Sequence, residues 1–343
     1  MSQRWLSPPR AIRADTLPAF KAFAPERSLI VPAFFFSLMP SSFQALYLAG
    51  QTGSGKTSVA RELIREMAPV EIVNADAFQL YRGMKILSAA PSSTEQELCP
   101  HHLFGLLDPA SECDAVTFAG LAKASIAEVT TRAVPLIVGG SGLYLKAITH
   151  GLAPTPKGNQ ALRAELDLLS LEALVERYQA LDPAGAAKTN LKNRRYVTRN
   201  LEICLLTGHP ASTLKSEWQE NAPVIRAVYL QREREDVYER INRRTRQMFE
   251  SGVVEEVARL GPLSTTAEKA IGLREIQAHL RGEMDRETCI AAIQQSTRHF
   301  AKRQESWFKR ETAFHRLEVS PNEDASTTAG KIIELISPLT GQG

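Results

Sequence analysis

The residues best suited to chemistry form a glycine-rich loop, Gly50-Gln51-Thr52-Gly53-Ser54-Gly55-Lys56-Thr57. The pattern G-x-x-x-x-G-K-[ST] is typical of loops that bind di- or triphosphates through backbone N–H groups at a helix start. Lys56 adds a positive charge, and the Thr57 hydroxyl is a potential ligand for Mg²⁺. An apolar run enters the loop and a helical pattern over 58–67 leaves it, which argues against a glycine turn without a ligand. The pattern does not say which phosphate compound binds.

A carboxylate follows the next apolar run. Val70–Asn74 has the composition of a strand, and Asp76 stands just beyond its end. Ligands of open α/β sheets lie at the carboxyl ends of strands, so Asp76 is expected beside the phosphates. There it would hold Mg²⁺ or act as a general base. The alternative is a helix N-cap without a chemical role.

Four short apolar runs would position these groups, and they cover Ala45–Ala49, Val70–Asn74, Pro135–Val138 and Val224–Leu230. Helical patterns lie between them. Continuous apolar strands that alternate with helices predict a parallel sheet covered on both faces. The fold class is therefore α/β, with a P-loop NTPase-like core.

The composition changes after Gly151. A Pro- and Gly-rich linker is followed by apolar residues at helical spacing over 161–178, which predicts a small all-helical insertion domain. The predicted organisation is a leader over 1–42, the first part of the core over 43–153, the insertion over 154–194, the second part of the core over 195–320 and a peripheral tail over 321–343. The leader is interpreted as disordered or untranslated, with Met39 as the true start; an organellar transit segment is the alternative.

Charge and cysteine content narrow the function classes. The 343 residues carry a formal net charge of +3, and the first 38 residues account for all of it, so global charge gives no argument for nucleic acid. Four scattered cysteines indicate a reducing compartment. Cys99, His101, His102 and Cys113 could be zinc ligands, although their spacing matches no familiar metal pattern. The apolar run over 29–38 is too short to cross a bilayer, so no membrane association is expected.

The segment Asp76-Ala77-Phe78-Gln79-Leu80-Tyr81-Arg82-Gly83-Met84 resembles the D-S-x-Q-x-Y-R-G-M motif of tRNA dimethylallyltransferases, also called tRNA isopentenyltransferases. Further segments resemble that family in the same order: Val134–Tyr144, Arg199–Ile203 with Thr207-Gly208, the series Arg240, Arg244, Met248, Gly252 and Glu256, then Lys269–Gly272 and Ala301–Trp307. The resemblance spans residues 44–310, which is most of the chain.

The resemblance implies transfer of a dimethylallyl group from dimethylallyl diphosphate to N6 of adenosine 37 in the anticodon stem-loop of tRNA. It implies that residues 50–57 and Mg²⁺ hold the diphosphate, with Thr57 as the metal ligand. Arg244 would neutralise charge on the leaving oxygen, because a guanidinium binds phosphate through two parallel hydrogen bonds. Asp76 would accept the proton of the adenine amine. A cytoplasmic monomer is expected.

The resemblance also implies a set of RNA contacts. The target base must leave its stack, and the implied contacts are Asp76, Ala77, Phe78, Gln79, Ser141, Arg163, Arg195, Tyr196, Val197, Thr198, Arg199, Lys269, Ala270, Ile271, Gly272, Leu273, Arg274, Lys302 and Arg303. Basic clusters over 188–199 and 297–310 suit an RNA backbone, although solvated helix faces would look the same. The chain departs from the family pattern at Ala77, Leu87, Ala90, Tyr196 and Leu273.

Three other functions fit parts of the sequence. A free-nucleotide (adenylate) isopentenyltransferase would share the loop and Asp76, but such enzymes generally lack the full helical insertion. A small-molecule kinase would need arginines that close over a γ-phosphate. A non-catalytic RNA-binding regulator would not need Lys56, Asp76 and Arg244 together.

Overall fold

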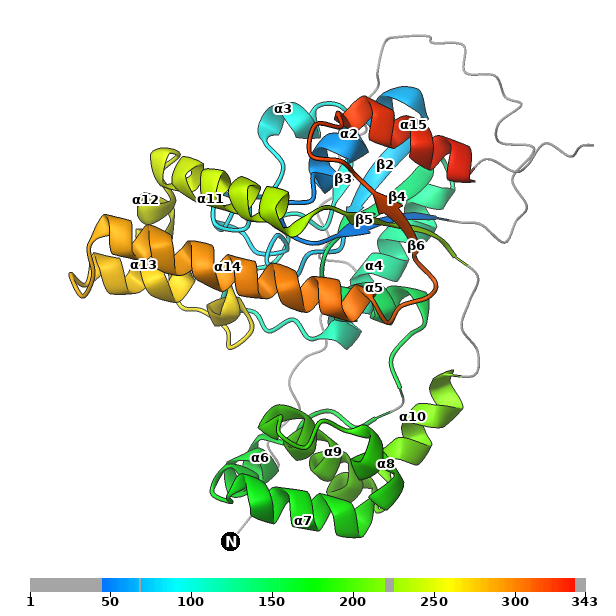
Figure 1. Cartoon of the computed structure of the whole chain (residues 1–343), viewed down its shortest axis with the longest axis vertical. Coiled ribbons are helices and arrows are strands. Elements are labelled where there is room, and N and C mark those ends of the chain that lie inside the picture. The colour runs from blue at the N-terminus through cyan, green and yellow to red at the C-terminus, as the bar shows by residue number, and fades with distance from the viewer. Residues whose placement is uncertain (1–44, 68, 154, 220–224, 337–343) are drawn as a thin grey trace, which may run out of the picture. The chain divides into compact units, whose positions relative to one another are not determined.

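The computed structural model describes residues 45–67, 69–153, 155–219 and 225–336 (Figure 1). Its central feature is one parallel sheet with the strand order β3-β2-β4-β1-β5-β6. The strands are β1 Leu46–Gly50, β2 Val70–Asn74, β3 His101–His102, β4 Val134–Gly139, β5 Arg226–Gln231 and β6 His315–Glu318. The predicted α/β class is confirmed.

The four predicted strands correspond to β1, β2, β4 and β5, within one or two residues at each described end. The two edge strands were not predicted. β3 has two residues and β6 is mostly exposed, so neither has the continuous apolar run that marks a buried strand. The predicted leader and position 224 lie outside the described residues.

Helices cover both faces of the sheet because successive side chains of a strand point in opposite directions. In β1, Leu46 and Leu48 pack with α2 and α15, whereas Tyr47 and Ala49 pack with the helices of the other face. The core helices are α2 Lys56–Glu66, α3 Ser93–Gln96, α4 Ala115–Thr130, α5 Gly142–Thr149, α11 Arg234–Glu250, α12 Val253–Ala258, α13 Leu273–Leu280, α14 Arg286–Phe308 and α15 Ala325–Ile336, with the 3₁₀ turn η2 Ala267–Lys269.

The prediction of a peripheral tail over 321–343 is wrong for its described part. The helix α15 lies against α2, and its residues Ala329 and Ile332 are fully buried in the apolar cluster on that face (Figure 1). The prediction was based on the polar composition of the segment, and most polar residues of α15 lie on its outer face.

The chain between β4 and β5 contains an all-helical segment, as expected. Its helices are α6 Gln160–Asp167, α7 Leu171–Leu181, α8 Pro183–Lys188, α9 Arg194–Thr207 and α10 Ala211–Gln219. The predicted end of this segment at residue 194 is wrong. Val197 and Leu201 of α9 share one apolar core with Leu174 and Tyr178 of α7, so the segment continues through α9 and α10. In the part of the chain that the structure describes, each helix is too short or too polar to span a lipid bilayer.

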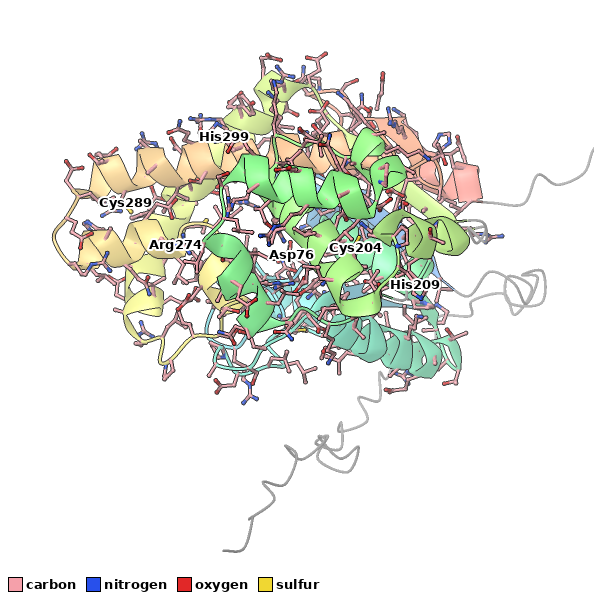
Figure 2. All side chains as sticks on the ribbon, turned by 90° about the horizontal axis from the view of Figure 1, so that it is seen from below. Asp76, Cys204, His209, Arg274, Cys289 and His299 are labelled. Atoms are coloured by element: carbon pink, nitrogen blue, oxygen red, sulfur yellow. The ribbon has the colours of Figure 1, made fainter. Side chains whose placement is uncertain are left out.

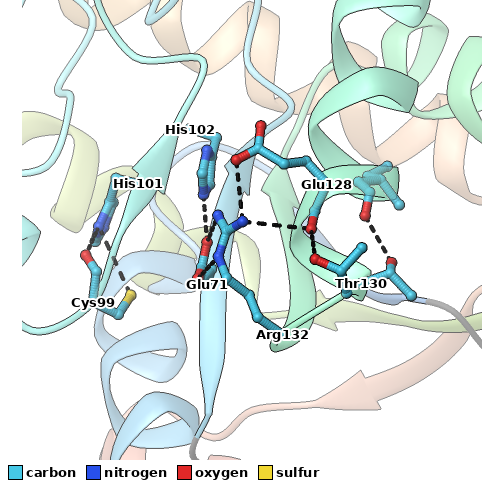
Figure 3. A network of polar contacts seen from close by, with 9 residues as sticks. Glu71, Cys99, His101, His102, Glu128, Thr130 and Arg132 are labelled. Atoms are coloured by element: carbon cyan, nitrogen blue, oxygen red, sulfur yellow. Dashed lines mark hydrogen bonds and ion pairs between the residues drawn. The ribbon is translucent and has the colours of Figure 1, made fainter. Parts of the chain in front are cut away.

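An ion-pair network joins β2 to its neighbours at the sheet edge (Figure 3). The carboxylate of Glu71 accepts hydrogen bonds from Nε and Nη2 of Arg132, at 2.8 and 2.9 Å, and lies 2.7 Å from Nε2 of His102. His101 turns instead to Cys99, with its Nδ1 2.8 Å from the Cys99 carbonyl oxygen. Among the described residues there is no group of three or more His, Cys, Asp or Glu side chains that would hold a metal, so the zinc alternative is wrong.

Burial disfavours the charge on Glu71, but the hydrogen bonds from Arg132 and His102 outweigh it and hold the pKa of the carboxyl below its usual value of 4.5. The ionised form is therefore the one that the folded state stabilises. Its contribution to the free energy of unfolding is present above that value and is lost as the pH falls through the lowered pKa.

We expect Glu71→Gln to lower the free energy of unfolding at neutral pH by about 2 kcal/mol, because two charge-assisted hydrogen bonds lose their acceptor charge. The matched control is Glu128→Gln, since Glu128 also pairs with Arg132 but is 60% exposed. That change should cost less than about 0.5 kcal/mol. Urea unfolding measures both; equal losses in the two variants would contradict the assignment.

Candidate active site

The glycine-rich loop joins the end of β1 to the start of α2. Gly55 caps the helix with φ of 92°, a left-handed conformation that favours glycine. This conformation turns the chain sharply, so the first N–H groups of α2 face the end of the sheet. A helix N-terminus in this position attracts an anion through its unpaired N–H groups and its dipole.

Arginines hold the loop from the carbonyl side. Nε of Arg240 donates to the carbonyl of Gly53 at 2.8 Å, and Nη2 of Arg244 donates to Oγ1 of Thr52 at 2.6 Å. Both arginines come from α11. The two guanidinium groups therefore lie against the loop and add positive charge beside it.

Lys56 completes this positive cluster. Its Nζ donates to the carbonyls of Gly50 and Gln51, at 2.7 and 3.0 Å. Burial lowers the pKa of Lys56 to about 8, although the nearby carboxylate of Asp76 opposes the shift and Arg244 adds to it. The bonding partners of this ammonium group are neutral carbonyl oxygens, and a phosphate ligand would balance its positive charge.

Asp76 lines the same cavity as Lys56 and Arg244, and the positive charges of both act to lower the pKa of its carboxyl. Burial raises the pKa of Asp76 despite these two cations. Its Oδ1 accepts a hydrogen bond from the N–H of Phe78 at 3.1 Å, and the residues that follow form turns, so the helix N-cap alternative is wrong.

The fully buried Asn74 fixes the backbone of this turn. Its Oδ1 accepts from the N–H of Asp76 at 2.7 Å, and its Nδ2 donates to the carbonyls of Asp76 and Leu103. Sequence analysis did not identify Asn74 as part of the site. The signal was present, because an asparagine at the end of an apolar strand is unusual unless its amide is satisfied.

A second site residue that the sequence analysis missed is Gln304 of α14. Its Oε1 accepts from the N–H of Thr52 and its Nε2 donates to the carbonyl of Gly140, both at 2.8 Å. The next residue along, Ser141, accepts from the N–H of Ala77 at 3.4 Å. One buried amide thus links the phosphate loop to the loop that contacts the turn after Asp76.

These groups line one cavity of about 320 Å³ whose two ends differ in character. Arg240, Arg244 and Met248 of α11 all line it; they are four residues apart, so they share one face of the helix. The face therefore changes from guanidinium groups beside the phosphate loop to a thioether one turn further on. Apolar residues of the lining near Met248 and α14 include Phe78, Leu87, Met248, Ile271, Ile293 and Phe300, and Ile64, Ile72, Leu98, Phe104 and Val138 also line the cavity.

The structure places the expected RNA contacts in different surroundings. Phe78, Gln79, Ala270 and Ile271 line the cavity itself. Exposed side chains follow on several helices and on η2: Arg195, Tyr196, Lys269, Arg274, Lys302 and Arg303. Figure 2 marks Arg274 and Asp76. The side chains of Val197 and Leu273 are buried in apolar cores, so the expectation that they contact RNA is wrong for their side chains.

Arg163 and Arg199 are also engaged elsewhere than expected. Both pair with Glu202, which is fully buried: Arg163 through Nε at 2.9 Å and Arg199 through Nη1 at 2.6 Å. Glu202 also accepts from the N–H of Asn159 at 2.7 Å, and Arg199 donates to the carbonyl of Pro156 at 2.6 Å. These arginines fasten the chain that precedes α6 to α9, because a buried carboxylate needs such partners.

Comparisons with known proteins find similarity to transferases of one kind. Residues 79–311 match the model of the IPP transferase family. The tRNA dimethylallyltransferase of Akkermansia muciniphila is 43% identical over 290 residues, which cover 84% of this chain and 98% of that protein. The full-length tRNA isopentenylpyrophosphate transferase of Bacillus halodurans superposes with a TM-score of 0.63 at 30% identity and covers 85% of this chain and 95% of its own.

A eukaryotic dimethylallyltransferase that acts on tRNA has the same fold, with a TM-score of 0.71. At 23% identity over 87% of this chain and 81% of that chain, this likeness concerns the fold alone. The shared architecture includes the sheet on which the phosphate loop and Asp76 are placed.

We expect Lys56→Met to weaken binding of inorganic diphosphate roughly 10- to 100-fold near neutral pH, because a charged hydrogen-bond donor is lost. The pKa of Lys56 is lowered to about 8, so the wild-type advantage should shrink as the pH rises through that value. Calorimetric titration of wild type and variant across this range measures the difference. Lys85→Met, at an exposed lysine, is the control; a gap between wild type and Lys56→Met that does not change with pH would contradict the assignment.

Proposed function

This chain belongs to the IPP transferase family, and on that basis we propose that it transfers a dimethylallyl group from dimethylallyl diphosphate to N6 of adenosine 37 in tRNA, with release of diphosphate. The observation that carries the proposal is the cavity with unlike ends. Its cationic end suits a diphosphate, its apolar end suits a five-carbon chain, and Asp76 lies beside the cationic end, where the bond to oxygen would break.

The chemistry follows from this arrangement. The bond between the allylic carbon and the diphosphate oxygen breaks, and its electron pair leaves with diphosphate. Lys56 and Arg244, which are half-buried and line the cavity, stabilise that developing charge. The N6 lone pair then forms the new carbon–nitrogen bond, and the N6 proton passes to Asp76. A carboxylate whose pKa is raised by burial is a better base than an ordinary aspartate.

Magnesium fits the donors present. The Thr57 hydroxyl lines the cavity, and a hard oxygen ligand of this kind suits Mg²⁺, which binds through one or two protein groups plus phosphate oxygens. When bound, the metal would neutralise part of the diphosphate charge. Lys56, Arg240 and Arg244 neutralise the remainder.

The tRNA substrate is supported by the exposed basic residues around the site. Lys269, Arg274, Lys302 and Arg303 are exposed on η2, α13 and α14, elements that also line the cavity or flank its lining. A phosphate backbone bound there would bring an unstacked anticodon-loop base towards Asp76. We place this reaction in the cytoplasm and in a monomer, unless residues 1–38 direct the chain to an organelle.

The direct test uses a tRNA with adenosines at positions 36 and 37, dimethylallyl diphosphate and Mg²⁺. Mass analysis of the digested tRNA should show one isopentenyl group on adenosine 37. AMP serves as the competing acceptor. Folded protein that modifies AMP and leaves several such tRNAs unchanged would identify a free-nucleotide enzyme and overturn the proposal.

We expect Asp76→Asn to slow prenyl transfer roughly 10²- to 10⁴-fold, because the amide cannot accept the N6 proton. Its oxygen can still accept from Phe78, so the turn and the affinity for diphosphate should persist. The pKa of Asp76 is raised above 3.8, so the wild-type single-turnover rate should fall as the pH drops through that raised value. Asp108→Asn, at an exposed loop residue, is the control. Wild-type turnover by Asp76→Asn would remove the base assignment.

We expect Arg244→Lys to lower the transfer rate roughly 100-fold, because an ammonium group cannot reproduce the planar guanidinium that contacts Thr52 and faces the leaving oxygen. Arg246→Lys is the control on the same helix, since Arg246 is 57% exposed and pairs with Glu287. Single-turnover assays at saturating donor measure both. Equal rates for the two variants would show that Arg244 serves only to fix the loop.

A further inference from the structure

The apolar end of the cavity has a wall built from a loop rather than from a helix or strand. Leu87, Ser88, Ala89 and Pro91 line the cavity there. Ala89 has φ of 50°, in the left-handed region that alanine rarely adopts. A loop in this conformation needs contacts from outside itself to keep its shape.

Glu256 of α12 supplies those contacts from behind the wall. Its Oε2 accepts from the N–H of Ile86 and its Oε1 accepts from the N–H of Leu87, both at 2.8 Å. One carboxylate thus binds two consecutive N–H groups about 170 residues away in the chain. These bonds are roughly twice as strong as bonds to a neutral acceptor.

The other end of the loop is held from the cavity side. Nε2 of Gln79 donates to the carbonyls of Ser88 and Ala89, at 3.2 and 3.1 Å. The side chain of Leu87 is 6% exposed and packs beside Gly272 and Ile293, and Ile293 also lines the cavity. The wall therefore has little freedom while both anchors are present.

We infer that Glu256 is a positioning residue that fixes this wall against the hydrocarbon part of the prenyl donor. The inference rests on the proposed function and deepens it. The charged end of the cavity is built from the phosphate loop and α11 and does not depend on Glu256. Loss of Glu256 should therefore weaken recognition of the hydrocarbon chain and leave recognition of diphosphate intact.

The experiment compares Glu256→Ala, Glu256→Gln and Glu255→Gln in the full-length chain. Glu255 is the matched control, because it is the exposed neighbour of Glu256 on the same helix. We expect Glu256→Ala to raise the KM for dimethylallyl diphosphate about tenfold, a loss comparable to one charge-assisted hydrogen bond. The affinity for inorganic diphosphate and the KM for tRNA should stay within about twofold. Glu256→Gln keeps one acceptor oxygen, so it should give an intermediate KM.

Hydrogen exchange at the amides of Ile86 and Leu87 gives a readout that does not depend on activity, and both amides should exchange faster in Glu256→Ala. An unchanged donor KM would overturn the inference, as would an equal loss of affinity for donor, diphosphate and tRNA, which indicates general destabilisation. If Glu256→Ala does not fold, the same comparison of the KM for donor and tRNA and the affinity for diphosphate is made with Glu256→Gln, and it tests the inference in the same way. Absence of transfer by the wild-type protein would overturn the proposed function and this inference together; transfer with an unchanged variant overturns the inference alone.

Discussion

The site depends on holding several cations close together. Backbone carbonyls make this possible: Lys56 donates to Gly50 and Gln51, and Arg240 donates to Gly53. These bonds hold the cations beside the loop while its N–H groups at the start of α2 stay available to an anion. Asp76 offsets part of the charge from close by. Burial shifts the pKa of both Lys56 and Asp76 towards their neutral forms, and the attraction between the two groups opposes both shifts.

A buried hydrogen-bonded contact between residues far apart in the sequence fixes the loop that contains Thr52 relative to the loop that contains Gly140 and Ser141. Gln304 bonds to Thr52 and Gly140, although 252 residues separate Gln304 from Thr52. Gly142, two residues further on, lies so close to the ring of Trp307 that a Cβ there would collide with it. α14 thus fixes the donor loop and the loop around Ser141 with adjacent turns, and it presents Lys302 and Arg303 to solvent on its outer side.

Short-range sequence patterns predicted those structural features that depend only on residues close together in the chain. The apolar runs gave β1, β2, β4 and β5, and the glycine-rich loop gave the phosphate site, because each depends on neighbouring residues. The roles of Asn74, Gln304 and Glu256 depend on partners brought together by folding, and no spacing in the sequence indicates those partners. The same limit applies to Arg163: the resemblance implied an RNA contact, and its ion pair with the buried Glu202 could not be predicted from the sequence.

The packing of α15 on α2 affects how the protein folds while it is being translated. Ala329 and Ile332 close the apolar layer under Val59 and Leu63, in the helix that begins with Lys56. The helix that begins with Lys56 therefore lacks part of its support until almost the whole chain has left the ribosome. A messenger truncated shortly before α15 would encode every residue of the proposed chemistry and still yield a protein whose donor site is poorly formed.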